Sequence, residues 1–135
     1  MKTKECVILR GVPGCGKSTL AEILIGEVGK RFEADDYCYN KEGVYEFVPA
    51  NIKANHQNCY DDFVGAIDDG VSPVVVSNTS TELWQYKRYM EYAANAGYKV
   101  TVTVVENYHG GKSIHNVPEE TLDNMREKLT KSITL

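Results

Sequence analysis

Apolar and polar residues follow two different patterns along the chain, and their succession predicts an α/β fold. Four short segments are typical of strands, at residues 4–10, 30–34, 74–77 and 98–105. Four longer segments predict helices, at about residues 18–28, 50–69, 81–96 and from 118 onward. Strands that alternate with helices favour a parallel sheet with right-handed crossovers. Ligands of such sheets bind beyond the carboxyl ends of the strands, so we expect the functional site there.

The first three predicted helices each have an apolar face, which we expect to pack on the sheet. The expected inner residues are Leu20, Ile23, Leu24 and Val28 in the first helix, Ile52, His56, Cys59, Phe63 and Ile67 in the second, and Leu83, Tyr86, Met90, Ala93 and Ala94 in the third. Thr81 is the expected N-cap of the third helix. At its inward position His56 fits a core or hydrogen-bonding role better than a catalytic one.

Composition places the chain among ordinary globular proteins. It has 135 residues, 42% hydrophobic and 25% charged, and we expect one domain over residues 1–135. No apolar run is long enough to cross a bilayer, and residues 1–5 lack the apolar core of a signal peptide. The four cysteines are widely spaced without a C-x-x-C pair, which indicates reduced thiols. We therefore expect a cytoplasmic protein with no membrane partner.

The net charge of −4 argues against non-specific, salt-driven binding along a nucleic-acid duplex. This net charge is compatible with a locally basic pocket that binds one nucleotide or one strand end. Only four arginines are available for such a pocket: Arg10, Arg31, Arg88 and Arg126.

Residues 11–19 form the clearest motif, with the G-x-x-x-x-G-K-[ST] spacing of a phosphate-binding P-loop between a strand and a helix. Its glycines permit positive φ and leave no Cβ between the backbone amides and an anion. Lys17 is expected to bridge the β- and γ-phosphates, and Ser18 to bind Mg²⁺. The expected nucleotide-binding residues are Gly11, Pro13, Gly14, Cys15, Gly16, Lys17, Ser18 and Thr19. The alternative is a glycine-rich turn that only links the strand to the helix.

Cys15 would lie beneath the phosphates of a bound nucleotide. We therefore expect ATP to protect its thiol from alkylation.

Further motifs follow the P-loop in a specific order. They are Ala34-Asp35-Asp36-Tyr37, Tyr45-x-Phe47, His56, Val76-Ser77-Asn78-Thr79-Ser80-Thr81-x-x-Trp84, Ala96-Gly97-Tyr98-x-Val100 and His115-Asn116-Val117-Pro118. With this set the chain resembles, over nearly its full length, the small P-loop kinases of the phage polynucleotide 5′-hydroxyl kinase type and their eukaryotic relatives. The resemblance implies a three-layer P-loop NTPase fold with a mainly parallel sheet of about four strands in the order 2-3-1-4. It also implies a mobile lid loop at about residues 106–118.

The resemblance assigns a catalytic role to the first aspartate of the Asp-Asp-Tyr motif. In the family this residue orients or deprotonates the acceptor hydroxyl, and here it is Asp35. A carboxylate suits that task, because a hydroxyl that attacks a γ-phosphoryl group needs a proton acceptor. The alternative is that Asp35 and Asp36 only cap a turn. Asp36 fits better as a support of the loop or of a Mg²⁺-bound water.

Three positions depart from the family pattern. The lid usually supplies arginines to the phosphates, but here it has Lys112, which offers a charge without the bidentate fork. A solvated lysine is the alternative for Lys112. The third strand ends in Ser77-Asn78, where relatives commonly have an aspartate, and Cys38 replaces a basic residue. Mg²⁺ would then depend on Ser18 and water, with Asp35 or Asp36 behind the water.

The leading hypothesis is a kinase that uses ATP and Mg²⁺. Its acceptor is a hydroxyl on a nucleic-acid end, a nucleotide or a nucleoside-like molecule, with Lys17, Asp35 and Lys112 as the catalytic residues. The resemblance favours a polynucleotide 5′-end, whereas Cys38 and the acidic net charge argue against a long polynucleotide. The alternative is a nucleotide-binding regulatory module without phosphotransfer activity, which the missing strand-end acid and the lid without arginine support.

Overall fold

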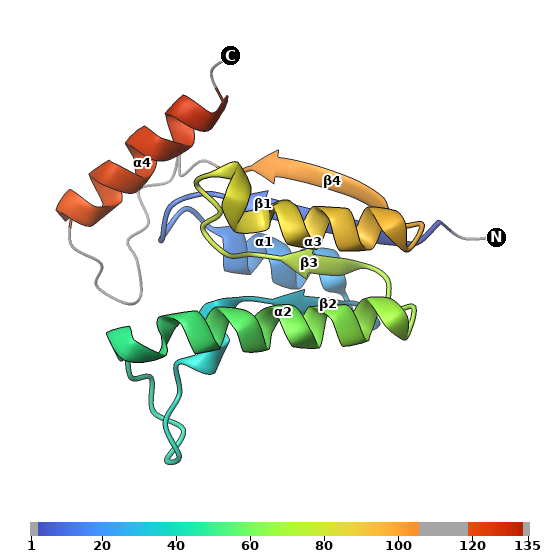
Figure 1. The fold of residues 1–135 in the computed structure, drawn as a ribbon, viewed down its shortest axis with the longest axis horizontal. Coiled ribbons are helices and arrows are strands. Elements are labelled where there is room, and N and C mark those ends of the chain that lie inside the picture. Colours follow the sequence, from blue (N-terminus) through green and yellow to red (C-terminus); the bar gives the residue numbers. More distant parts are fainter. Residues whose placement is uncertain (1–2, 106–118, 134–135) are drawn as a thin grey trace.

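The computed structural model describes residues 3–105 and 119–133, and in these residues it has one four-stranded sheet (Figure 1). The strands are β1 (Glu5–Arg10), β2 (Lys30–Phe32), β3 (Val74–Val76) and β4 (Lys99–Val104). All neighbouring strands are parallel, in the order β2-β3-β1-β4. The predicted α/β class and the strand order 2-3-1-4 are confirmed.

Four α-helices accompany the sheet in the part of the chain that the structure describes. They are α1 (Lys17–Ile25), α2 (Ile52–Asp68), α3 (Leu83–Asn95) and α4 (Glu119–Ile133). Helices α2 and α3 pack side by side on one face of the sheet, and α1 covers the other face (Figure 1). Helix α4 lies beyond the carboxyl ends of the strands, where the functional site is expected. None of the described helices is long and apolar enough to span a bilayer.

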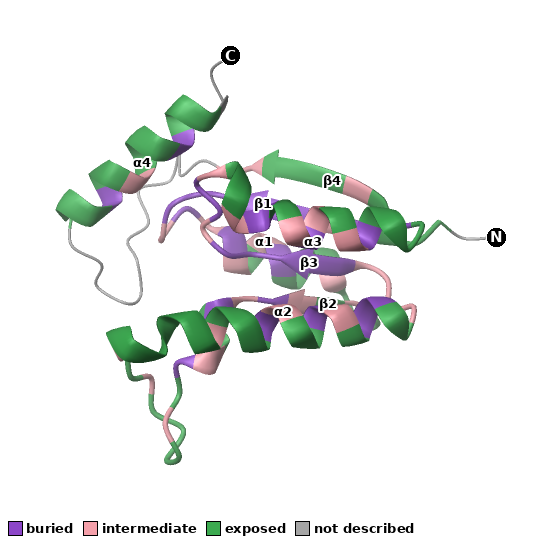
Figure 2. Cartoon of the chain, viewed as in Figure 1, coloured by how far each residue is buried: buried purple, intermediate pink, exposed green. Residues whose placement is uncertain are grey.

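Side chains of the central strands alternate between the two helical layers, as the two-residue period of a strand requires. Cys6 and Ile8 of β1 join the cluster that includes Phe63 of α2, whereas Leu9 packs with Ala21 of α1. In Figure 2 the buried residues are concentrated on β1 and β3, which lie between neighbouring strands. Such strands have to be apolar on both faces, which explains the uninterrupted apolar run of β3.

The apolar face predicted for the first helix is correct at Leu20, which packs against the cluster of Leu9, Ala21 and Val75, and wrong at its other three residues. Ala21 is fully buried, but Ile23 is 72% exposed, Val28 is 79% exposed, and Leu24 is also exposed. The helix ends at Ile25, before Val28, and it approaches the sheet closely through the small Ala21 side chain. Large apolar residues a turn later along the helix therefore face solvent.

The predictions for the other two helices hold in part. Cys59, Phe63 and Ile67 of α2 are buried, whereas Ile52 and His56 in its first turns are exposed. The inward position predicted for His56 is therefore wrong.

In α3, Tyr86 and Ala93 are buried as predicted, but Leu83 and Ala94 are exposed. The predicted N-cap is also wrong, because the N-cap of α3 is Glu82 and not Thr81, in a capping box with Gln85.

The segment between β2 and α2 contains a turn and a small hairpin. Strand β2 ends at Phe32, before the predicted residue 34, and residues Ala34–Tyr37 form a 3-10 turn. A single antiparallel bridge joins Tyr39 to Tyr45 in the loop that follows. Figure 1 shows this hairpin projecting from the body of the molecule beside the N-terminal end of α2.

Candidate active site

The P-loop joins β1 to α1 and has the backbone that its glycines allow. Gly14 and Gly16 have φ of 84° and 98°, a region in which any side chain is strained. A Cβ on Gly11 would lie 2.7 Å from the carbonyl oxygen of Val105, at the end of β4. The Gly11 N–H donates to the carbonyl of Thr79 at 3.0 Å, which ties the loop to the residues after β3. The loop conformation is therefore fixed by its neighbours and excludes side chains at three positions.

Lys17 lies inside this loop at the first residue of α1. Its side chain is 6% exposed, and Nζ donates to the carbonyl of Val12 at 3.2 Å. A buried ammonium group at a helix N-terminus provides a second positive element beside the helix dipole, which suits an anion. Of the other predicted nucleotide-binding residues, Pro13 is half-buried and Thr19 is exposed.

Cys15 lies in the interior of the loop, where its side chain is 2% exposed. It packs with Val12 and with Leu122 of α4. This burial does not fit the reagent-accessible thiol that the sequence prediction assumed.

Ser18 contacts a carboxylate that the sequence analysis missed. Its hydroxyl donates to both side-chain oxygens of Glu33, at 3.3 and 3.2 Å. Glu33 directly follows β2, at the same edge of the sheet as the P-loop. One signal was available, since Glu33 lies at the carboxyl end of the second predicted strand, and ligands of parallel sheets bind beyond such ends. The family pattern instead drew attention to the end of β3.

Burial raises the pKa of Glu33, which is the largest influence on this group. The positive charge of Arg31 opposes the increase, while the negative charges of Asp35 and Asp36 add to it. The pKa of this partly buried carboxyl group thus depends on opposing influences: burial and the two aspartates raise it, and Arg31 lowers it. A cation bound nearby stabilises the charged form of such a group and so favours loss of its proton.

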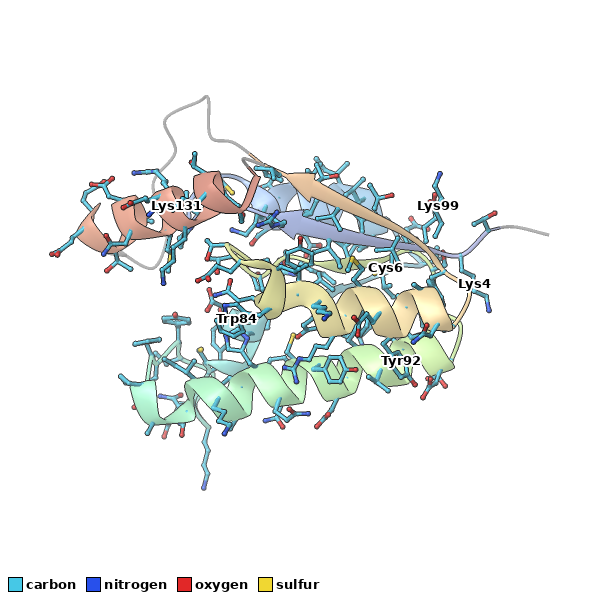
Figure 3. All side chains as sticks on the ribbon, turned by 45° about the horizontal axis from the view of Figure 1, so that its top comes forward. Lys4, Cys6, Trp84, Tyr92, Lys99 and Lys131 are labelled. Atoms are coloured by element: carbon cyan, nitrogen blue, oxygen red, sulfur yellow. The ribbon has the colours of Figure 1, made fainter. Side chains whose placement is uncertain are left out.

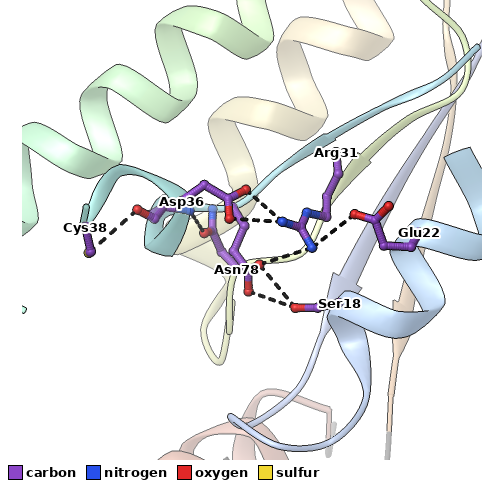
Figure 4. Close-up of polar contacts among 8 residues, drawn as sticks. Ser18, Glu22, Arg31, Asp36, Cys38 and Asn78 are labelled. Atoms are coloured by element: carbon purple, nitrogen blue, oxygen red, sulfur yellow. Dashed lines mark hydrogen bonds and ion pairs between the residues drawn. The ribbon is translucent and has the colours of Figure 1, made fainter. Parts of the chain in front are cut away.

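Arg31 is the centre of an ion-pair network that includes Glu33 (Figure 4). One of its amino groups donates to both carboxylate oxygens of Asp36, at 2.9 and 3.0 Å. The other lies 3.3 Å from Glu22 of α1 and 3.9 Å from Glu33. Arg31 thus joins α1, β2 and the turn after β2. Asp36 is held in this clamp, which makes it a support of the loop.

Asp35 is exposed in the 3-10 turn, next to the clamped Asp36. Its negative charge raises the pKa of Glu33 and of Cys38 and opposes a decrease in the pKa of His56. Asp35 is therefore close to the residues on both sides of the turn, and its side chain is open to solvent.

Asn78 lies two residues beyond β3, where a carboxylate is common in the family that the chain resembles. It is buried, and its side-chain oxygen accepts a 2.7 Å hydrogen bond from the backbone N–H of Ala34. Ser77 before it is also buried, and its hydroxyl has no partner among the described residues. The end of β3 therefore positions the turn with Asp35 and contributes no carboxylate.

Cys38 and Lys112 are the remaining positions at which the sequence departs from the family pattern. Cys38 is buried, and burial raises the pKa of its thiol, while Asn55 donates to its sulfur at 3.4 Å. A charged acceptor group therefore has no direct partner at this position. Lys112 and the predicted lid lie outside the described residues.

Few protein ligands are available for Mg²⁺ at this site among the described residues. Among the described residues no group of three or more His, Cys, Asp or Glu side chains is placed to hold a metal ion. Mg²⁺ usually keeps several waters and binds one or two protein oxygens together with substrate phosphates. The Ser18 hydroxyl and the Glu33 carboxylate, in mutual contact at the P-loop, fit that requirement.

Comparisons with solved structures confirm the P-loop kinase-like fold. A chain of the structure described as "Structure of Pnkp1/Rnl/Hen1 complex" superposes with a TM-score of 0.62 and 19% identity, over 92% of this chain and 39% of the other. The APS kinase CysC of Mycobacterium tuberculosis, as a Cys556Ala mutant, superposes with a TM-score of 0.56 and 15% identity, over 96% of this chain and 99% of the other.

Sequence comparisons match this chain to curated relatives and to a family model. Human NEDD4-binding protein 2 is 28% identical over 138 residues, which cover 96% of this chain but only 8% of the relative. The family model described as RNA helicase matches residues 7–107, more than half of the chain. That span includes the P-loop, the turn with Asp35 and all of α2 and α3. The chain therefore belongs to the family described as RNA helicase, and its fold is that of the P-loop kinases.

Proposed function

We propose that the protein is a Mg²⁺-dependent kinase that transfers the γ-phosphoryl group of ATP to a hydroxyl. The proposed acceptor is a nucleic-acid 5′-hydroxyl end or a nucleotide or nucleoside-like molecule. The contact between Ser18 and Glu33 is the observation that carries the proposal. It holds Glu33, two residues before Asp35, against the P-loop, at the edge of the sheet where ligands of parallel sheets bind.

In this proposal the P-loop amides and Lys17 bind the β- and γ-phosphates, and Ser18 and Glu33 hold the metal. When bound, Mg²⁺ neutralises charge on the phosphates. The acceptor oxygen forms a bond to the γ-phosphorus, the bond from that phosphorus to the β–γ bridging oxygen breaks, and ADP leaves. Asp35 takes the proton of the attacking hydroxyl. Lys112 is a proposed third cation at the transferred group.

A second candidate is a nucleotide-binding module that transfers nothing. It is favoured by the end of β3, where Asn78 bonds to the backbone and supplies no carboxylate. Both candidates require ATP binding at the P-loop, so binding alone does not separate them.

Phosphotransfer to a panel of acceptors separates these candidates. The protein is incubated with γ-labelled ATP, Mg²⁺ and 5′-hydroxyl oligonucleotides, nucleosides or nucleotides, and label in the acceptor is measured. We expect transfer by the wild type, loss of transfer in Lys17→Ala and a decrease of about 100-fold or more in Asp35→Asn. Asp69→Asn, an exposed aspartate at the opposite end of α2, is the matched control.

ATP binding without transfer to any acceptor would leave the binding module as the function. ATP hydrolysis that duplex RNA stimulates, again without transfer, would instead favour strand separation, as the name of the matched family suggests. Transfer that persists in Asp35→Asn would remove Asp35 from its proposed role.

The metal site has its own test, which does not need catalysis. The affinity for ATP is measured by calorimetry with and without Mg²⁺, and bound Mn²⁺ is followed by electron paramagnetic resonance. We expect Glu33→Gln to weaken the metal-supported part of ATP binding by about 10- to 100-fold. Glu22→Gln also removes one carboxylate from the Arg31 network, but it does not contact Ser18, and it is the control. An equal effect of both variants would contradict the assignment of Glu33.

A further inference from the structure

Two contacts between α1 and the end of β2 lie side by side. Ser18 and Glu22 are four positions apart on α1, and Arg31 and Glu33 are two positions apart on an extended backbone that begins in β2. The Ser18 hydroxyl donates to Glu33, and Arg31 lies 3.3 Å from Glu22. Four residues advance a helix by about 6 Å, and two residues advance a strand by about 6.6 Å. Because these spacings match, both contacts can form at once between the helix and the strand.

Arg31 connects this pair of contacts to the turn after β2 (Figure 4). One of its amino groups faces Glu22, and the other donates to both carboxylate oxygens of Asp36, at 2.9 and 3.0 Å. A planar guanidinium group can hold two carboxylates at once in fixed directions, which a lysine ammonium group cannot. Asp36 directly follows Asp35, so the position of the Asp35 turn depends on Arg31.

The contact of Arg31 with Glu33 is of a different kind. The two charged groups are 3.9 Å apart, which makes an ion pair that is too long for a hydrogen bond. The Glu33 oxygens instead accept from the Ser18 hydroxyl. Only 21% of the Arg31 side chain and 15% of the Glu33 side chain are exposed, so salt screens their attraction weakly. Arg31 therefore restricts the position of the Glu33 carboxylate and leaves its oxygens directed at the P-loop.

We propose that Arg31 is a positioning residue of the candidate active site. It fixes the Glu33 carboxylate at the metal position beside Ser18 and, through Asp36, it fixes the turn that carries Asp35. Arg31 contacts neither the metal nor the acceptor and acts only through these carboxylates. The inference rests on the proposed function, in which Glu33 binds Mg²⁺ and Asp35 takes a proton. It adds that one residue controls both the metal side and the acceptor side of the site.

A cation beside a metal site can also have the opposite effect on metal binding. If Arg31 only neutralised negative charge, its removal would leave three carboxylates unopposed, and a divalent cation would bind more tightly. If Arg31 positions Glu33, its removal lets the carboxylate move away from the metal, and the cation binds more weakly. The direction of the change in metal affinity therefore distinguishes the two roles.

Metal binding is measured on the full chain with ATP, with Mn²⁺ as the probe and electron paramagnetic resonance as the readout. We expect Arg31→Met to raise the dissociation constant of Mn²⁺ about tenfold or more, with the metal-free affinity for ATP unchanged. Arg31→Lys keeps the charge but not the planar fork, and it should raise the constant about threefold or more. Lys99→Met is the control, because it removes an equal charge from the start of β4, at the amino ends of the strands (Figure 3).

A double variant tests whether Arg31 acts through Glu33. Once Glu33→Gln has removed the carboxylate, Arg31→Met should weaken Mn²⁺ binding by less than about a further twofold. Full additivity of the two changes would overturn the positioning role. On the acceptor side, Arg31→Met and Asp36→Asn should each lower kcat about tenfold or more at saturating Mg²⁺, with the KM for ATP unchanged. Urea denaturation verifies that each variant is folded.

The outcomes separate this inference from the proposed function, because the metal measurements do not need catalysis. Weaker Mn²⁺ binding in Arg31→Met, without transfer by the wild type, would support the role of Arg31 at the metal position and overturn the kinase. Mn²⁺ binding that is unchanged or tighter in Arg31→Met would overturn the positioning role and leave the kinase standing where transfer occurs. Wild-type binding in Arg31→Lys would show that charge alone suffices, which also overturns it. No Mn²⁺ binding by the wild type would overturn both the metal site and this inference.

Discussion

The side-chain oxygen of Asn78 accepts a 2.7 Å hydrogen bond from the backbone N–H of Ala34. Asn78 lies just beyond β3, and Ala34 begins the turn that carries Asp35. Both residues are buried, so the N–H has no access to solvent that would replace the bond. A residue at a strand end thus determines where the adjacent loop begins.

The Asn78→Ala variant removes this acceptor and leaves the N–H of Ala34 buried without a partner. We expect a loss of about 1–3 kcal/mol in the free energy of unfolding, measured by urea denaturation. Asn124→Ala, at an exposed position of α4, should change it by less than about 0.5 kcal/mol. Equal stability of the two variants would show that the bond to Ala34 contributes nothing.

Glu33 should make stability and metal binding depend on pH in opposite directions. Burial raises its pKa above the ordinary value of 4.5, so the folded protein retains a proton that the unfolded chain has lost. The free energy of unfolding of the wild type, relative to Glu33→Gln, therefore falls as pH rises from about 4.5 through the raised pKa. Mg²⁺-supported ATP binding rises over the same range, because the metal requires the carboxylate.

Urea denaturation and calorimetry at a series of pH values measure the two trends. The difference between wild type and Glu33→Gln isolates this group from the other carboxylates. A difference in stability that is constant over the range would contradict a raised pKa.

We expect Arg10 to hold α4 against the rest of the protein. Its guanidinium donates to the carbonyls of Ser80 and Thr81, at 2.8 and 3.2 Å, and to the hydroxyl of Ser132 in α4, at 2.5 Å. It also lies over the ring of Tyr86. We expect Arg10→Met to cost about 2–4 kcal/mol in the free energy of unfolding, because it leaves buried acceptors unsatisfied. Hydrogen exchange should accelerate in α4 more than in α2.

The control for Arg10 is Lys128→Met, which also removes a contact of α4. Lys128 lies 3.7 Å from Glu82, and both side chains are exposed to solvent. An exposed ion pair contributes about 0–1 kcal/mol, so this variant should leave exchange in α4 nearly unchanged. If the two variants loosen α4 equally, the hydrogen bond from Arg10 is not what holds it.

The cysteine thiols should react only when the chain unfolds. All four are buried, including Cys15 in the P-loop. We expect little labelling by a thiol reagent in the native state, with or without ATP, and four labels per chain in denaturant. Rapid native labelling of Cys15 that ATP prevents would restore the sequence-based prediction and contradict the burial of this side chain.

The sequence predicts the strands and their order better than the helix faces. In β1 and β3 the apolar runs are uninterrupted because helices cover both faces of the sheet, and no other placement suits such runs. In α1 the face toward the sheet is marked by the small Ala21, while the larger Ile23 points to solvent. A pattern based on residue size and apolarity therefore identifies only Leu20 correctly in so short a helix.

The candidate site is also predicted only in part, because its local motif is found and its long-range contacts are missed. The P-loop is identified by local spacing, because its glycines, Lys17 and the Val12 carbonyl that Lys17 contacts lie within a few residues of one another. Glu33 is 15 residues from Ser18, and Asn78 is 44 residues from Ala34. Only the sheet topology brings these pairs together. A search for an acid at the end of β3 therefore missed the acid at the end of β2.

The hairpin after the Asp35 turn is held together mainly by hydrogen bonds between its own residues. Asn40 donates to the carbonyl of Val44, Gly43 donates to the carbonyl of Asn40, and Glu46 donates to the carbonyl of Cys38. Changes of length or sequence within such a loop leave the core contacts intact. The fold thus has a modular part beside a fixed P-loop, and this hairpin can be exchanged without change to the phosphate-binding framework.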